Sequence, residues 1–284
     1  MSYKIVIDSC GELTDELKRD PHYENVALEL DVDDYHVMDD ESFNQLEFLQ
    51  KVKESPNSPK SSCPPPARFM DAFGENDHVY MITLSSQLSG SYNSAMLAKE
   101  LYEEQQESEG EKKRTRIHVF DSKSASIGET LIGMKIQEYE EAGETFERII
   151  EKVEHYIADM NTFFVLESLE TLRKNGRLSN LKAALVTALN IKPVMGSTAI
   201  GAIQQLGQAR GMNKALESMV EKMLAVTKNC EEKVLAIAHC NCPDRAKRVK
   251  ERIEKLAHFK NIVIVNTAGV SSMYANDGGV ILAV

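Results

Sequence analysis

The sequence contains no run of 18 consecutive apolar residues, and this absence excludes a transmembrane helix. Basic residues are in the minority: 33 Lys and Arg stand against 44 Asp and Glu, and the net charge is −11. Such a surface repels phosphate backbones and anionic lipid heads, so we expect neither a nucleic-acid partner nor stable membrane insertion. The first eight residues form a short strand pattern ending in a charge rather than a signal peptide, which predicts a cytoplasmic protein.

Motifs typical of nucleotide binding and of hydrolase chemistry are also missing. The chain has neither a Gly-x-Gly-x-x-Gly pattern nor a Walker motif, so no nucleotide site and no cofactor are predicted. A Gly-x-Ser-x-Gly nucleophile elbow is absent too. The five cysteines lack framework spacing, and we expect reduced thiols. His239, Cys240 and Cys242 lack the fourth ligand of a structural zinc site, so no metal is predicted.

Short apolar strands alternate with helices in the first half of the chain, and this order predicts parallel βαβ units. The expected strands are Tyr3–Asp8, Val79–Leu84 and Ile117–Asp121, and the expected helices are Ser91–Gln106 and Ser126–Glu140. Ligands collect at the carboxyl ends of the strands in such sheets, so the loops that follow these three strands are the first candidates for a site.

Two features lie between the first two of these strands. Val26–Val32 reads as one extended stretch. Ser42 and Gln45 form a capping-box pattern that predicts a helix through about Lys53.

The second half of the chain predicts a different kind of sheet. A helix over Thr145–Met160 carries an apolar stripe and bridges to this part. Two strands that meet at Gly196–Thr198 must be antiparallel, because a parallel pair needs a long crossover. The expected strands are Thr162–Leu166, Ile191–Met195, Ala199–Leu206, Val234–His239, Ile262–Asn266 and Gly279–Val284, and the expected helices are Leu181–Leu189, Met212–Thr227 and Asp244–His258.

The predicted fold class is therefore α/β with two domains. Residues 1–157 form an N-terminal parallel-sheet α/β/α domain, and residues 158–284 form a C-terminal mixed-sheet α+β domain.

The loop after the second parallel strand is rich in hydroxyl groups. It holds four serines, at positions 85, 86, 89 and 91, together with Gly90, just where a helix begins. A helix amino terminus carries unpaired N–H donors and partial positive charge, so it attracts a carboxylate or a phosphate. Gly90 lets an anion approach the backbone closely. The alternative is that these serines only cap the helix.

A second segment of interest is dense in proline. Pro64, Pro65 and Pro66 fix a rigid loop, which holds Ser61 and Ser62 in place. On composition alone, an ordinary surface turn ahead of a helix is the simpler interpretation.

Both segments, with several others, resemble the DegV family of bacterial fatty-acid-binding proteins. The family carries Thr-Ser-Gln-Pro-Ser-Pro-Gly and Ser-Ser-x-Leu-Ser-Gly-Thr-Tyr patterns, where this chain has Ser61–Ala67 and Ser85–Tyr92. The further matches follow in order along the chain and are Ile7–Ser9, Asp121–Ser126, Leu166–Leu169, Arg173–Arg177 and Asn190–Pro193. The resemblance spans nearly the whole sequence.

The resemblance implies a long-chain fatty acid in a tunnel that the second domain covers. The hydroxyl groups of Ser61, Ser62 and Ser89 and the N–H of Gly90 are the implied carboxylate ligands. A buried carboxylate is tolerated only when its oxygens accept several hydrogen bonds, which fits this set. The acyl chain supplies the affinity, at roughly 0.8 kcal/mol per buried methylene.

One departure concerns the family's carboxyl-terminal histidine, which Tyr274 replaces here. A phenol donates a hydrogen bond to a carboxylate but does not become a cation near neutral pH.

The resemblance also implies a partner. Some family members present the bound acid to a separate ATP-using fatty acid kinase, which makes an acyl phosphate for phospholipid synthesis. Arg210 matches a family arginine, and we expect it to contact the kinase or the phosphoryl group, with an ordinary solvated arginine as the equal alternative. Arg173 and Arg177 are weaker candidates.

The leading interpretation is thus a binding protein with no catalytic residues of its own. A serine hydrolase or acyltransferase using Ser89 or Ser61 is the second interpretation, and it requires a base within hydrogen-bond reach. The third is a carrier of another lipid-like carboxylate without a kinase partner.

Overall fold

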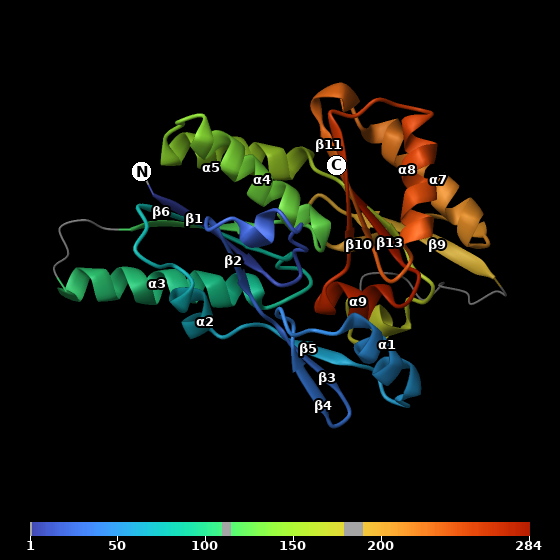
Figure 1. Cartoon of the computed structure of the whole chain (residues 1–284), viewed down its shortest axis with the longest axis horizontal. Helices are drawn as coiled ribbons and strands as arrows, with labels where there is room; N and C mark the ends of the chain where they lie inside the picture. Colours follow the sequence, from blue (N-terminus) through green and yellow to red (C-terminus); the bar gives the residue numbers. More distant parts are fainter. Residues whose placement is uncertain (1, 110–114, 179–189) are drawn as a thin grey trace.

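The computed structural model describes residues 2–109, 115–178 and 190–284. It contains a four-stranded parallel sheet in the N-terminal part, a six-stranded mixed sheet in the C-terminal part and a small three-stranded sheet (Figure 1). The α/β fold class is confirmed. In the described part of the chain, no helix is both long enough and apolar enough to cross a membrane.

The parallel sheet has the strand order β2-β1-β6-β7. Its strands are β1 (Tyr3–Asp8), β2 (Tyr23–Val26), β6 (His78–Thr83) and β7 (Arg116–Asp121). Successive side chains point to opposite faces, so Ile5 and Ile7 enter one core and Val6 and Met81 enter another. The helices of the first core are α4 (Ile127–Glu141) and α5 (Phe146–Asp159), and those of the second are α2 (Pro66–Asp71) and α3 (Ser91–Glu109). Figure 1 shows these pairs on opposite faces of the sheet.

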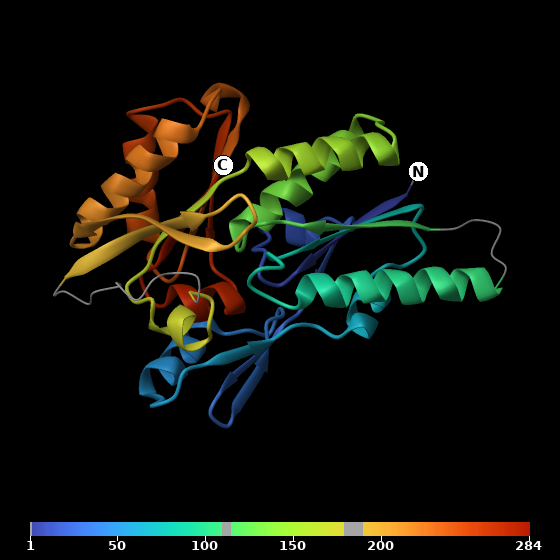
Figure 2. The same cartoon turned by 180° about the vertical axis from the view of Figure 1, so that it is seen from behind.

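The mixed sheet has the order β10-β9-β8-β13-β11-β12, and only β11 and β12 pair in parallel. Phe163, Leu235 and Leu282 pack against helices on one face. The opposite face contacts α4, so α4 packs between the two large sheets (Figure 2). The elements are β8 (Thr162–Val165), β9 (Ile191–Ser197), β10 (Ile203–Arg210), α7 (Met212–Val226), β11 (Val234–His239), α8 (Pro243–Glu254), β12 (Asn261–Asn266) and β13 (Val280–Ala283).

A small antiparallel sheet, β4-β3-β5, was not predicted. Its last strand carries Ser61 and Ser62, which pair with Leu30 and Glu29. It therefore fixes one of the two hydroxyl-bearing segments. The remaining elements are β3 (Glu29–Val32), β4 (Tyr35–Met38), α1 (Gln45–Glu54), β5 (Lys60–Ser62), α6 (Glu170–Lys174), α9 (Gly269–Ala275) and the short 3-10 helices Leu17–Arg19 and Cys230–Glu232.

The stretch Val26–Val32 is divided between two sheets, contrary to the prediction. Ser9 accounts for the break: its N–H donates to the carbonyl of Val26 at 2.9 Å, and its hydroxyl accepts from the N–H of Leu28 at 3.0 Å. These bonds satisfy backbone groups that a continuing strand would otherwise pair.

Three boundaries were also predicted wrongly. The helix that was expected to reach His258 ends at Glu254. The N-cap of α1 is Asn44, whose side chain accepts from the N–H of Glu47, whereas the Ser42 hydroxyl donates to Asp40. The strand expected from Ala199 begins at Ile203, because residues 198–202 form a tight turn. The antiparallel pairing of β9 with β10 is confirmed. The expected helix Leu181–Leu189 lies outside the described residues.

Candidate functional site

An apolar cavity of about 420 Å³ lies where the parallel sheet, the mixed sheet and α9 meet. The loops after β1, β6 and β7 all reach it, through Cys10, Leu84 and Ser124. These are the loops at the carboxyl ends of the parallel strands, where α/β sheets place ligands. The apolar lining includes Leu28, Leu84, Leu88, Phe164, Leu166 and Ile281.

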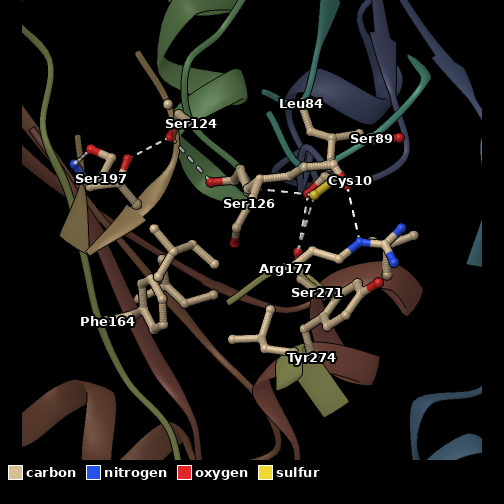
Figure 3. Close-up of a pocket in the computed structure, with 18 of the residues that line it drawn as sticks. Cys10, Leu84, Ser89, Ser124, Ser126, Phe164, Arg177, Ser197, Ser271 and Tyr274 are labelled. Atoms are coloured by element: carbon tan, nitrogen blue, oxygen red, sulfur yellow. Dashed lines mark hydrogen bonds between the residues drawn. The ribbon is translucent and has the colours of Figure 1, made fainter. Parts of the chain in front are cut away.

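Hydroxyl groups from the two predicted segments meet at this cavity. Ser61, Ser62, Ser89, Gly90 and Tyr274 all line it, although they come from three distant parts of the chain. Figure 3 shows Ser89, Arg177 and Tyr274 on one side of the pocket, with Ser124, Ser197 and Phe164 on the other. The predicted residues thus lie together at one end of a mostly apolar cavity, which we call the polar end, and Ser124 and Ser197 add hydroxyl groups on the opposite side.

Local contacts hold the serine loop and the proline loop together. The Ser94 hydroxyl on α3 donates to the carbonyl of Pro64 at 2.5 Å. A Cβ on Gly90 would lie 3.3 Å from the sulfur of Cys63, so the two loops pack closely. Ser89 accepts from the N–H of Ser91 at 3.2 Å, and the two hydroxyls are 3.1 Å apart. Ser89 therefore supports the helix start and also borders the cavity.

The three arginines occupy different environments. Arg177 lines the cavity, and its Nε donates to the carbonyl of Leu88 at 3.1 Å. Arg173 is exposed and forms an ion pair with Glu170 at 2.8 Å. Arg210 is exposed at the end of β10 and does not line the cavity. The structure thus brings only Arg177, among the three, to the predicted carboxylate ligands.

No base adjoins the two candidate nucleophiles in the described residues. The hydroxyl of Ser89 contacts that of Ser91. Within the described residues, no histidine, lysine or carboxylate forms a hydrogen bond with the hydroxyl of Ser89 or with that of Ser61. A serine nucleophile requires such a base.

The cavity wall also contains residues that the sequence did not single out. Cys10, Ser126 and Ser271 line it as well. Ser126 has φ 62° and ψ −141°, a backbone conformation that residues other than glycine rarely adopt. Its N–H donates to the sulfur of Cys10 at 3.4 Å and its hydroxyl to Glu12 at 2.7 Å. These contacts hold the strained residue in the wall.

Four carboxyl groups are buried near the cavity, which is uncommon for acidic residues. They belong to Asp8, Glu12, Asp39 and Glu129, and none is more than 3% exposed. Asp8 accepts the N–H groups of Cys10 at 3.1 Å and Leu84 at 3.0 Å. Asp39 accepts those of the first two residues of α9, at 2.6 and 2.8 Å. Asp8 and Asp39 therefore position the loops that form the site.

These carboxyls give a first prediction, on stability. Burial raises the pKa of Asp8 to about 6, of Glu12 to about 7 and of Asp39 to about 6. These pKa values exceed those of the unfolded chain, so the folded protein holds its carboxyl protons more tightly. The stability that the protonated groups contribute is complete below about pH 4 and is lost as pH rises through 6 and 7.

We therefore expect the free energy of unfolding to fall by about 3 kcal/mol or more between about pH 5.5 and pH 8. Denaturant titrations at constant ionic strength measure it. A free energy that rises over this interval would contradict the role assigned to these carboxyls.

A second prediction concerns the tip of the β9–β10 hairpin, which closes one side of the cavity. Gly201 has φ +83°, and its carbonyl accepts from the Ser85 hydroxyl at 2.9 Å. A Cβ there would lie 2.3 Å from that hydroxyl and 2.7 Å from the Cα of Lys123.

Gly201→Ala is expected to lower the free energy of unfolding by about 3 kcal/mol, because backbone strain and a steric clash add together. Gly143→Ala is the matched control. Gly143 has φ +73° but nothing within 4 Å of its Cβ position, so about 1 kcal/mol of strain is expected. Equal losses in the two variants, measured by chemical denaturation, would show that the hairpin contact carries no stability.

Comparisons with known proteins match over the whole chain. A family model described as "Uncharacterised protein, DegV family" covers residues 2–283. A DegV domain-containing protein of Streptococcus gordonii is 32% identical over 99% of this chain and 98% of its own.

Solved structures agree with this. A DegV family protein of Ruminococcus gnavus, refined with vaccenic acid, is 50% identical, with a TM-score of 0.95 over 100% of this chain and 99% of that one. The Fatty Acid Kinase (Fak) B3 protein of Streptococcus pneumoniae, loaded with linoleic acid, is 29% identical, with a TM-score of 0.87 over 100% and 99%.

Proposed function

This chain belongs to the DegV family, and on that premise we propose that it binds a long-chain fatty acid in the cavity and presents it to a separate fatty acid kinase. The observation that carries the proposal is a mostly apolar cavity in which Ser89, Tyr274 and Arg177 gather on one side. An acyl chain matches the apolar lining, and a carboxylate needs the hydrogen-bond donors. The similar proteins of Ruminococcus gnavus and Streptococcus pneumoniae carry vaccenic and linoleic acid.

The carboxylate is held by hydroxyl groups from two loops. Ser61 and Ser62 approach from β5, and Ser89 with the N–H of Gly90 approaches from the start of α3. Tyr274 on α9 supplies a phenol that donates a further hydrogen bond. Arg177 adds positive charge at the same end, which favours the anionic form of the ligand. The chain itself has a binding role, and the chemistry takes place on the kinase.

We assign the partner contact to the arginines outside the cavity. Arg210 is exposed and available to a protein or to a phosphoryl group, which guanidinium recognises well. Arg173 is engaged by Glu170, so it is the weaker candidate. A kinase partner places the protein in the cytoplasm, where ATP is available.

Denaturing mass spectrometry of a solvent extract tests the binding role. The purified protein is expected to release one fatty acid per chain. Addition of a fatty acid kinase and ATP is expected to convert the bound acid to its acyl phosphate. An empty protein that also takes up no C14 to C18 acid would remove the proposal.

A carrier without a kinase partner is the second candidate. The observation that favours it is Tyr274, which stands where the family has a histidine and gives no cation near neutral pH. A protein that binds the acid stoichiometrically, but whose ligand is never phosphorylated by a fatty acid kinase, would support this second function.

A further inference from the structure

A cluster of buried carboxyl groups lies directly behind the cavity wall. We call Asp8, Glu12 and Glu129 the acid cluster, and each is at most 2% exposed. Three wall residues contact it, and one of them is Leu84, whose N–H donates to Asp8 at 3.0 Å. The N–H of Cys10 donates to Asp8 at 3.1 Å, and the hydroxyl of Ser126 donates to Glu12 at 2.7 Å. The cluster and the ligand cavity thus share a wall one residue thick.

The acid cluster is short of donors and of positive charge. Both carboxyl oxygens of Glu129 and one of Glu12 have no hydrogen-bond donor in the described part of the chain. An oxygen of Asp8 and an oxygen of Glu129 lie within 4.8 Å of each other, and burial together with the neighbouring Asp8 raises the pKa of Glu129 well above its usual range. No lysine, arginine or histidine of the described residues pairs with the cluster. The other titratable groups that face it are Cys10, Asp39 and Cys240.

The acid cluster and the proposed carboxylate site contact the same wall residues. Asp8 accepts the N–H groups of Cys10 and Leu84, and both of these residues line the cavity. On the cavity side, the hydroxyl of Ser89 is 3.1 Å from that of Ser91, which is fully buried. A charge that arrives at Ser89 therefore lies close to the carboxyl groups behind the wall.

We infer that binding of a fatty acid carboxylate at Ser89 is coupled to uptake of a proton by the acid cluster. The inference rests on the proposed function, because it requires an anionic ligand at that end of the cavity. The ligand brings a negative charge into a region of low dielectric, where charges interact strongly. The cluster responds by converting one carboxylate to the neutral acid, with the proton supplied by solvent.

The direction of the effect follows from this coupling. Burial already holds the pKa of Asp8 at about 6 and that of Glu12 at about 7, so the cluster titrates near neutral pH. A second negative charge nearby raises both pKa values further. The ligand then binds more tightly as pH falls from about 8 to about 6.5. If binding raises the pKa of one carboxyl by about one unit, the affinity rises by up to about tenfold. A more alkaline environment favours release.

Isothermal titration calorimetry tests the inference on the delipidated full chain. Vaccenic acid, delivered from cyclodextrin, is titrated at about pH 7 in buffers that differ in ionisation enthalpy. The slope of the observed binding enthalpy against the ionisation enthalpy of the buffer gives the number of protons taken up per ligand. We expect a positive fraction of a proton per ligand, roughly one half.

Two variants locate the proton. Glu12→Gln and Glu129→Gln keep the side-chain shape and remove titratable groups, so each is expected to bind vaccenic acid with reduced proton uptake. Glu104→Gln, on the exposed face of α3, is the matched control and should behave as wild type. Circular dichroism establishes folding, and if one variant does not fold the other carries the test.

The outcomes separate the two proposals. Wild-type protein that binds the acid without proton uptake overturns the inference and leaves the proposed function in place. Uptake that persists unchanged in both folded variants also overturns it. A wild-type protein that binds no fatty acid at all overturns the proposed function itself. Uptake in wild type that falls in either variant supports the acid cluster as the proton acceptor.

Discussion

Removing the hydroxyl groups of Ser61 and Ser89 together is expected to abolish measurable fatty acid binding while leaving the fold intact. Each hydroxyl donates one hydrogen bond to a charged carboxylate in the proposed complex, and such a bond is worth about 1.5–3 kcal/mol. Each single change to alanine should therefore weaken binding by roughly ten- to a hundredfold, and the double change by about a thousandfold or more. Calorimetric titration with vaccenic acid measures the affinities.

Two matched variants control for indirect effects. Ser61→Thr retains the hydroxyl and should bind nearly as well as wild type. Ser86→Ala removes a hydroxyl from the same loop as Ser89, but one that donates to Asp121 and does not line the cavity. If Ser86→Ala lost as much affinity as Ser89→Ala, the loss would reflect the loop's stability and not a contact with the carboxylate.

Filling the cavity is expected to have the second largest effect. Ala125 lines it, next to Ser124 and Ser126 in the chain. A phenylalanine there would displace about three methylenes of a C16 or C18 chain, at about 0.8 kcal/mol each. Ala125→Phe should thus weaken binding of these acids by roughly 50-fold. Displacement of a fluorescent fatty acid provides the measurement.

The chain length of the ligand distinguishes a filled cavity from a damaged fold. A C10 or C12 acid leaves room in the cavity, so its affinity should change much less, and Ala125→Val should give an intermediate result. Equal losses for short and long acids would mean that the carboxylate end had been disturbed, or that the chain does not occupy the space beside Ala125.

Much of the fold was predictable because its signals are local. The apolar runs of β1, β6 and β7 alternate with helical periodicity, and this order alone specifies a parallel sheet. The small sheet was missed because β3 and β5 are short and pair across about thirty residues. Ser9, which ends β2 by bonding to Val26 and Leu28, acts from a distant position, so no local pattern reveals it.

Some residues of the candidate site were predictable from local sequence, and others were not. Ser61, Ser89 and Gly90 stand in segments with a clear composition and a family resemblance, and the structure places all three on one cavity. The sequence named Arg210, and more weakly Arg177, for contact with the partner, but it did not predict that Arg177 lines the cavity. Its position depends on how the second domain packs on Leu88, which spacing along the chain does not encode.

The burial of the carboxyl groups could not be predicted from the sequence. Glu129 lies in a helix and Glu12 in a loop, and acidic residues in such elements are mostly exposed. Only the packing of α4 between the two sheets buries Glu129 beside Asp8. The sequence pattern of a helix shows which of its faces is apolar. It does not show that other elements will also pack over its polar face.

A crystal structure with an ω-bromo fatty acid would show both the occupancy of the cavity and the direction of the ligand, because the anomalous signal of bromine marks the end of the acyl chain. We expect a bromine peak in the cavity on the side of Phe164 and Ser197, with the carboxylate within hydrogen-bond distance of Ser89 at the opposite end. A bromine peak beside Ser89 and Tyr274, or none in the cavity, would contradict this expectation.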